Sequence, residues 1–281
     1  MRTVLFFNVG TAHVPRLLVA TQSLRRVGGF DRIVILDPDP SPIVRAIAQG
    51  CGGTVSGVEF QKRRMHSAYV AKAGLWRHPL FDARDNVLQI DSDVLFARNV
   101  APLFETVDER LTVTQFGHWN TQGKTIRGRV LQWEKLYPGL VAAALQTPHP
   151  AINTGVVGWR RGRDVDLLEE WNALSIHGWR RSFTDELAMQ LLLVRDRLGR
   201  SQRMTVVDDS WNASPVYKEA KEKDVRIWHF HGGKHTNDAK GGAVWWSVFR
   251  EAYAANIADV QLWARNFDPR IDERLRFQAA A

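Results

Sequence analysis

Cysteine is almost absent from the sequence, since Cys51 is the only one among 281 residues. A single cysteine excludes an internal disulfide and a zinc site built from thiolates, and it suits a reducing compartment. Long apolar runs are absent too, because no stretch reaches the roughly twenty residues that span a bilayer as a helix. The apolar opening is interrupted at Asn8 and Gly10, too early for a secretory signal. We therefore expect a cytoplasmic protein, either soluble or peripherally attached to the inner face of the membrane.

The composition is that of an ordinary globular protein. The chain is 44% apolar and 24% charged, so it can bury a full hydrophobic core in one large or two small domains. It has no internal repeat, low-complexity tract or obvious linker. The formal net charge of +8 favours an anionic partner, and phosphates, acidic lipids and nucleic acid all fit that description. Charge alone does not choose among the three.

Strand-like and helix-like segments alternate along the chain. Runs rich in β-branched and aromatic residues predict strands at 3–8, 32–37, 54–60, 86–97, 111–116, 152–159, 204–209 and 225–231. Longer amphipathic runs predict helices at 14–26, 41–50, 68–76, 164–176 and 184–198. This alternation is typical of α/β proteins whose parallel sheet is covered on both faces. We predict one such domain over residues 1–242, followed by a helical, basic and aromatic extension over residues 243–281 that packs on the domain or on an anionic membrane.

A pair of carboxylates interrupts the segment at 86–97. Asp91 and Asp93, with Ser92 between them, follow an apolar run that has the pattern of a buried strand. Ligands of open α/β sheets gather at the carboxyl ends of strands, and carboxylate oxygens suit Mg²⁺ or Mn²⁺. A divalent ion there would neutralise a diphosphate and stabilise it as a leaving group, which fits a nucleotide-sugar donor. The alternative is a solvated turn.

The same spacing of two aspartates occurs twice more. The copy at 37–39 contains a proline and is followed by another, which favours a turn. The copy at 164–166 opens a predicted helix, where acidic residues complement the helix dipole. We therefore expect only the copy at 91–93 to end a central strand.

A second cluster of chemistry-bearing residues lies at the end of the last predicted strand. It contains His229, His231, Lys234 and His235, with paired glycines inside it. Imidazole joins carboxylates on manganese, glycines let the backbone approach a phosphate, and a lysine supplies a mobile positive charge. The alternative is one histidine in a polar pocket followed by a basic solvent loop.

In their order along the chain, these segments resemble the glycogenin-like and bacterial lipooligosaccharide galactosyltransferase family, known as glycosyltransferase family 8. The similar motifs lie between residues 3 and 235 and include AYVAKAGLW, AINTGVVGW, DELAMQ and SWNASP. The resemblance implies the GT-A fold, a Rossmann-like α/β fold of nucleotide-diphospho-sugar transferases with a mixed, mostly parallel central sheet. It also implies a metal-dependent enzyme that retains the anomeric configuration.

The resemblance assigns roles to individual residues. Asp91, Asp93 and His229 would bind the metal ion, Mn²⁺ or Mg²⁺. Asp185 and Glu186 would lie beside the reacting sugar carbon. The donor would be bound by Asn8, Gly10, Thr11, Lys72, Ser92, Asn153, Thr154, Gly155, Gly232 and Lys234.

The sequence departs from the family's pattern in several places. Thr154 replaces the commoner serine, and Glu186 replaces a glutamine. The loop from Gly232 to Lys234 is one residue short, which leaves His231 as a rival third metal ligand. The family's usual tyrosine after the first strand is absent.

The function implied by the resemblance is transfer of a hexose, glucose or galactose, from a UDP-sugar to a saccharide, lipid-linked or protein acceptor. A sugar nucleotidyltransferase is one alternative, although residues 8–16 lack the repeated glycines that cradle a triphosphate. A basic nucleic-acid-binding protein with interleaved aromatic residues is another. A catalytically silent sugar-binding protein would explain Glu186 and the short loop. If the chain is a transferase, we expect it to have no nucleic-acid partner.

The chain contains eleven tryptophans. Their positions predict that four are buried in helices or strands: Trp76, Trp133, Trp159 and Trp171. Trp119 and Trp211 are the better candidates for stacking against a sugar ring.

Overall fold

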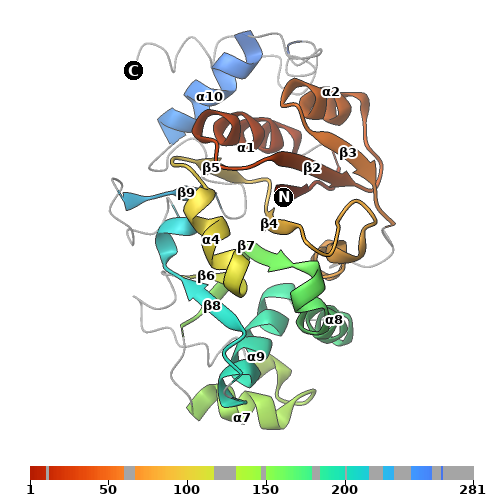
Figure 1. The fold of residues 1–281 in the computed structure, drawn as a ribbon, viewed down its shortest axis with the longest axis vertical. Coiled ribbons are helices and arrows are strands. Elements are labelled where there is room, and N and C mark those ends of the chain that lie inside the picture. The colour runs from red at the N-terminus through yellow and green to blue at the C-terminus, as the bar shows by residue number, and fades with distance from the viewer. Residues whose placement is uncertain are drawn as a thin grey trace.

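A seven-stranded mixed sheet forms the centre of the structure, a computed structural model (Figure 1). The structure describes residues 1–10, 13–59, 67–116, 131–146, 150–178, 184–199, 201–214, 224–230, 242–254 and 261. In spatial order the strands are β3 (Thr54–Gly57), β2 (Arg32–Asp37), β1 (Arg2–Phe7), β4 (Asn86–Ile90), β7 (Ile152–Arg160), β6 (Leu111–Gln115) and β8 (Met204–Val207). Every neighbouring pair is parallel except the two pairs that β7 makes. The predicted mixed, mostly parallel sheet is therefore confirmed.

Helices cover both faces of this sheet. They are α1 (Val14–Val27), α2 (Pro42–Gly50), α3 (Ser67–Lys72), α4 (Ala101–Glu109), α7 (Pro138–Gln146), α8 (Arg161–His177), α9 (Thr184–Leu198) and α10 (Gly242–Ala254). Short 3₁₀ turns are η2 (Leu75–Arg77), η3 (Leu131–Trp133) and η4 (Asp209–Trp211). In Figure 1, α1, α2 and α10 gather at the top of the view, and α7, α8 and α9 at the bottom.

Alternate side chains of the central strands enter two separate hydrophobic clusters. Val4 and Phe6 of β1 pack with the apolar faces of α1, α2, α4 and α10. Leu5, between them, packs with α7, α8 and α9. Both faces of β1 are thus buried, which explains its nearly continuous apolar sequence. The four tryptophans predicted to be buried are at most 4% exposed, as expected.

Most predicted elements are present. The strand at 32–37 and the helix at 184–198 have the predicted bounds, whereas the strand predicted at 54–60 ends at Gly57. The sequence did not reveal α4 or α7. Each is nine residues long, so its apolar periodicity extends over little more than about two turns.

The segment predicted as one strand at 86–97 forms two strands in different sheets. β4 ends at Ile90, and the chain leaves the central sheet before β5 (Val94–Phe96) begins. β5 pairs antiparallel with β9 (Ile227–His229), with Val94 opposite His229. The strand predicted at 225–231 is therefore only three residues long and belongs to this small second sheet.

The first helix of the C-terminal extension packs onto the domain. Trp245, Trp246 and Phe249 of α10 are 2–6% exposed and belong to the same hydrophobic cluster as α1. The Arg26 side chain of α1 also forms an ion pair with Glu251 of α10. Within the described ranges, none of the helices has the length and apolar character that crossing a bilayer requires. The domain boundary at residues 242 and 243 stays a prediction.

Truncation of Phe249 tests whether α10 is part of the folded domain. The Phe249 ring stacks on Trp245 with centroids 5.5 Å apart. We expect Phe249→Ala to lower the free energy of unfolding by about 3–5 kcal/mol, because it leaves a cavity in the shared core. Glu251→Ala, which removes the exposed ion pair, should change it by less than about 1 kcal/mol. Equal effects of the two variants in urea titrations would contradict this view of α10.

Candidate functional site

A cavity of about 400 Å³ opens beside the carboxyl ends of β1 and β4. Most of the predicted site residues in the described part of the chain line it. Its lining consists of Phe7, Val9, His13, Arg16, Ala68, Tyr69, Lys72, Asp91, Ser92, Asp93, Asn153, Thr154, Asp185, Glu186 and His229. The cavity therefore collects residues from distant parts of the sequence around the break between β4 and β5.

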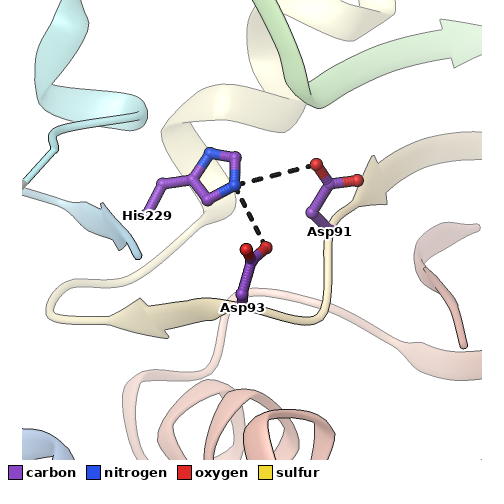
Figure 2. A group of neighbouring side chains, drawn as sticks. All are labelled: Asp91, Asp93 and His229. Carbon is purple, nitrogen blue, oxygen red and sulfur yellow. Dashed lines mark hydrogen bonds and ion pairs between the residues drawn. The ribbon is translucent and has the colours of Figure 1, made fainter. Parts of the chain in front are cut away.

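Asp91, Asp93 and His229 converge on one side of the cavity. Each offers one ligand atom, and these atoms lie within 4.8 Å of one another. His229 Nε2 is 3.1 Å from Asp93 Oδ1 and 3.7 Å from Asp91 Oδ2. Figure 2 shows both interactions leaving the same ring nitrogen, while the other nitrogen points away from the carboxylates.

Backbone hydrogen bonds fix the three side chains relative to one another. The pairing of β5 with β9 places His229 opposite Val94, the residue after Asp93. The amide of Phe230 donates to the carbonyl of Asp93 over 2.8 Å. The amide of Asp91 donates to the carbonyl of Gly155 in β7 over 2.9 Å. The group is thus held by both sheets rather than by a free loop.

These three residues fit a divalent cation. Two carboxylates and an imidazole are a donor set suited to Mn²⁺. Burial of the His229 ring would lower its pKa, but the Asp93 and Asp91 carboxylates outweigh burial and raise it. The imidazole therefore lies in a field that favours positive charge, which a metal ion would supply in place of a proton.

Lys72 connects this group to the acids at the start of α9. Its ammonium nitrogen lies 2.5 Å from Asp91 Oδ1 and 3.6 Å from Asp185 Oδ2. Burial would lower the pKa of Lys72, but the two aspartates raise it above its usual value. Burial raises the pKa of Asp185, opposed by Lys72 and by the Thr154 hydroxyl, which donates to Asp185 over 2.8 Å. A buried cation thus lies between two carboxylates.

Asp185 and Glu186 occupy the first turn of α9, where the helix dipole favours negative charge. Glu186 accepts a hydrogen bond from the Asn153 amide over 3.2 Å. The register of β6 against β7 shifts between Val113 and Thr114, beside Asn153. Such irregularities redirect side chains next to functional sites. Here Asn153 and Thr154, which are consecutive in β7, both line the cavity.

Three of the predicted donor-binding residues that the structure describes do not line the cavity: Asn8, Gly10 and Gly155. Asn8 is buried and donates to Asp37 Oδ2 over 2.5 Å and to the carbonyl of Gly10 over 3.3 Å. Gly10 has φ of +78°, a left-handed conformation that glycine adopts without strain. Thr11, Gly232 and Lys234 lie outside the described residues, as does the rival ligand His231.

The copy at 37–39 also stands at the end of a strand, although that strand lies next to the edge of the sheet and β4 lies in its middle. Asp37 is the last residue of β2, which lies between β3 and β1. Its carboxylate accepts hydrogen bonds from Asn8 and, over 2.8 Å, from the amide of Asp39. The two copies therefore differ both in their place in the sheet and in what their carboxylates bind.

Trp211 is not available for sugar stacking. Its ring is 6% exposed, belongs to a hydrophobic cluster, and carries the Arg226 guanidinium 4.7 Å from its centroid. Trp119, the other candidate, lies outside the described residues.

Four polar residues near the site were not predicted from the sequence. His13, Arg16 and Tyr69 line the cavity. Arg16 Nη1 is 3.2 Å from His13 Nδ1, and burial together with Arg16 lowers the pKa of His13. Their three-residue spacing at the start of α1 places both on one helix face and was a usable signal. Asn212 contacts His229 and stands in the SWNASP segment, but the motif gave it no role.

Substitution of Gly155 tests whether Asp91, Asp93 and His229 bind a metal ion. A Cβ atom at this position would lie 2.3 Å from His229 Cε1 and 2.7 Å from Asn153 Oδ1. We expect Gly155→Ala to displace the imidazole and weaken Mn²⁺ binding by about 10–100-fold, the range typical of changes next to metal ligands. Electron paramagnetic resonance of unbound Mn²⁺ measures the affinity. Gly57→Ala, where a Cβ would meet nothing within 4 Å, is the control and should bind like wild type.

Removal of the buried cation provides a second test. Lys72→Met leaves Asp91 and Asp185 without their shared partner, so we expect the free energy of unfolding to fall by about 3 kcal/mol. Saturating Mn²⁺ should restore part of this loss, because it supplies positive charge beside Asp91. Arg195→Met, which removes a cation from an exposed pair with Glu170, should cost less than about 1 kcal/mol. Unchanged stability of Lys72→Met in urea would refute this electrostatic role.

Comparison with known proteins gives matches at the level of structure. No protein-family model and no curated protein matches the chain. The galactosyltransferase LgtC, in complex with donor and acceptor sugar analogs, is 18% identical with a TM-score of 0.55, over 89% of this chain and 95% of LgtC. Mouse xyloside xylosyltransferase 1 is 13% identical with a TM-score of 0.56, over 82% of this chain and 98% of that protein.

The bifunctional glycosyltransferase WbbM, in its apo form, is also similar in structure. It is 11% identical with a TM-score of 0.63 over 90% of this chain. This chain spans about half of WbbM, 51% of its length. At such identities the similarity establishes the fold, and the chain has the GT-A fold that its sequence motifs predicted.

Proposed function

We propose that this chain is a metal-dependent, retaining glycosyltransferase that moves a hexose from a UDP-sugar to a saccharide, lipid-linked or protein acceptor. The observation that carries the proposal is the group Asp91, Asp93 and His229 at the end of β4, in one cavity with Lys72 and Asp185. The GT-A fold and the match to LgtC with donor and acceptor sugar analogs support a sugar-transfer role. Glucose and galactose are the hexoses that the sequence resemblance favours.

The proposed roles of the residues follow from their positions. Asp91, Asp93 and His229 would hold Mn²⁺ or Mg²⁺, which would neutralise the donor diphosphate and stabilise it as a leaving group. Lys72 holds Asp91 and Asp185 in place on either side of its ammonium group. Asp185 and Glu186 would face the sugar and stabilise the positive charge that develops at its anomeric carbon.

Retention of configuration places the acceptor on the leaving-group side of the sugar. The bond between the anomeric carbon and the diphosphate oxygen breaks as the acceptor oxygen forms its bond to the same carbon. The acceptor proton passes to the departing diphosphate oxygen, so no separate general base is needed. The protein would act mainly by orienting the two substrates and excluding water.

A cytoplasmic location and contact with an anionic membrane remain part of the proposal. Trp245, Trp246 and Phe249 of α10 are buried against α1, so these three side chains do not supply the membrane contact. That contact would have to use residues after Ala254, where Arg265, Arg270, Arg274 and Arg276 lie close together in the sequence.

Calorimetry of UDP binding tests the proposal. We expect binding to require Mn²⁺ or Mg²⁺, to disappear with chelator, and to weaken by at least about tenfold in Asp93→Ala, because the ion bridges protein and diphosphate. Asp166→Ala is the matched control, since Asp166 belongs to the copy at 164–166 and pairs with Arg203 at the surface. UDP binding that is absent, or that ignores both metal and Asp93, would refute the proposed function and direct attention to polynucleotide binding.

A further inference from the structure

Amide side chains connect the proposed metal group to the proposed sugar-facing acid. His229 Nδ1 lies 2.7 Å from Asn212 Oδ1. Asn212 Nδ2 donates to Asn153 Oδ1 over 2.9 Å, and Asn153 Nδ2 donates to Glu186 Oε2 over 3.2 Å. Both asparagines are buried, with exposures of 2% for Asn212 and 6% for Asn153. In a dry site each of these polar atoms needs its partner.

The direction of each hydrogen bond in this series of side chains follows from the backbone amide of Gly155. The backbone amide of Gly155, which can only donate, contacts Asn153 Oδ1 over 2.7 Å. Asn153 therefore turns its amide nitrogen toward Glu186, whose carboxylate can only accept. The Asn212 atom that faces Asn153 Oδ1 must then be its nitrogen, and Asn212 presents its oxygen to His229.

The consequence for His229 is a fixed tautomer. Because Asn212 offers an acceptor, Nδ1 of the imidazole carries a hydrogen and donates it. Nε2 is then the nitrogen that faces Asp91 and Asp93 and can coordinate a metal ion. Metal-ligating histidines commonly have their second ring nitrogen held in this way.

The backbone of Asn212 is anchored to the strand that carries His229. The amide of Ala213 donates to the carbonyl of Ile227 over 2.9 Å, and the amide of His229 donates to the carbonyl of Ala213 over 2.8 Å. The backbone amide of Asn212 itself donates to the backbone carbonyl of Asp209 in η4 over 3.0 Å. The side chain thus starts from a backbone position that cannot drift relative to the imidazole.

We propose that Asn212 is a positioning residue that sets the tautomer of His229 and joins it through Asn153 to Glu186. One series of hydrogen-bonded side chains then connects the proposed metal ligand His229 to the proposed sugar-facing acid Glu186. This inference rests on the proposed metal site and does not depend on the identity of the donor or acceptor. The amide of Asn212 serves both ends at this place, whereas aspartate lacks the donor and an apolar residue lacks both donor and acceptor.

Two substitutions of Asn212 separate its contact with His229 from its contact with Asn153. Asn212→Ala removes both hydrogen bonds, so we expect Mn²⁺ affinity, measured on the protein without nucleotide, to fall by about 10–100-fold. Asn212→Asp keeps an acceptor for His229 Nδ1 but opposes Asn153 Oδ1 with a second acceptor. It should bind Mn²⁺ like wild type and lower kcat for the UDP-sugar at saturating Mn²⁺.

Ser214→Ala is the matched control. Ser214 is 3% exposed in the same segment, and within the described part of the chain its hydroxyl has no hydrogen-bond partner. It should leave both Mn²⁺ affinity and kcat unchanged. The inference is overturned if Asn212→Ala binds Mn²⁺ as tightly as Ser214→Ala, or if Asn212→Asp loses as much affinity as Asn212→Ala.

A spectroscopic measurement tests the tautomer without any change at Asn212. With Co²⁺ bound, proton NMR of the wild-type protein should show a strongly shifted, slowly exchanging signal from the Nδ1 hydrogen of His229. The signal should vanish in His229→Gln, and its absence from wild type with bound Co²⁺ would overturn the inference. If wild type binds metal as expected but turns over no UDP-sugar, the proposed function fails while the role of Asn212 stands.

Discussion

The pairing of β5 with β9 is the constraint on which the site depends. It is a contact of three residues on each side, yet it joins parts of the chain that are 136 residues apart at Asp93 and His229. The central sheet fixes only the other half, because β4 ends at Ile90 and Asp91 is tied to Gly155 of β7. A short ladder with low intrinsic stability persists here because its side chains lie in the core beneath α1 and α10. The packing of β5 and β9 against α1 and α10 thus determines how Asp91, Asp93 and His229, the proposed metal ligands, are placed relative to one another.

The charge of the cavity is opposite to that of the whole chain. The chain has a formal net charge of +8, but four carboxylates line the cavity, those of Asp91, Asp93, Asp185 and Glu186, against two permanent cations, Lys72 and Arg16. Like charges so close together in a partly dry cavity are unfavourable without compensation. A divalent cation would compensate two of them and would then attract the diphosphate of the proposed donor. The net charge did not reveal this local excess of carboxylates, which supports the proposed cation site.

Local sequence patterns located the strands and the long helices, because burial on both sheet faces leaves apolar runs such as Val4–Phe6, but they merged β4 and β5 into one strand. They also marked Asp91, Asp93 and His229, whose residue types suit a metal. Asp91 and Asp37 both stand at the end of an interior strand. They differ in their side-chain partners, which are Lys72 and His229 for Asp91 and Asn8 for Asp37, and these partners cannot be read from the local pattern. Asn212 could not be assigned a role for the same reason. Its importance comes from two side-chain contacts, with His229 and Asn153, that no spacing in the sequence encodes.

Glu186 shows how a departure from a family pattern can be read from its contacts. The Asn153 amide nitrogen needs an acceptor, and either a glutamine oxygen or a carboxylate oxygen can provide one. Glutamate in place of the family's glutamine therefore preserves the hydrogen bond from Asn153, the last one in the series that starts at His229. The substitution adds a negative charge in the first turn of α9, beside Asp185, where the helix dipole favours it. In the proposed mechanism that charge faces a sugar carbon that becomes positive as the diphosphate leaves, so glutamate at this position is compatible with transfer.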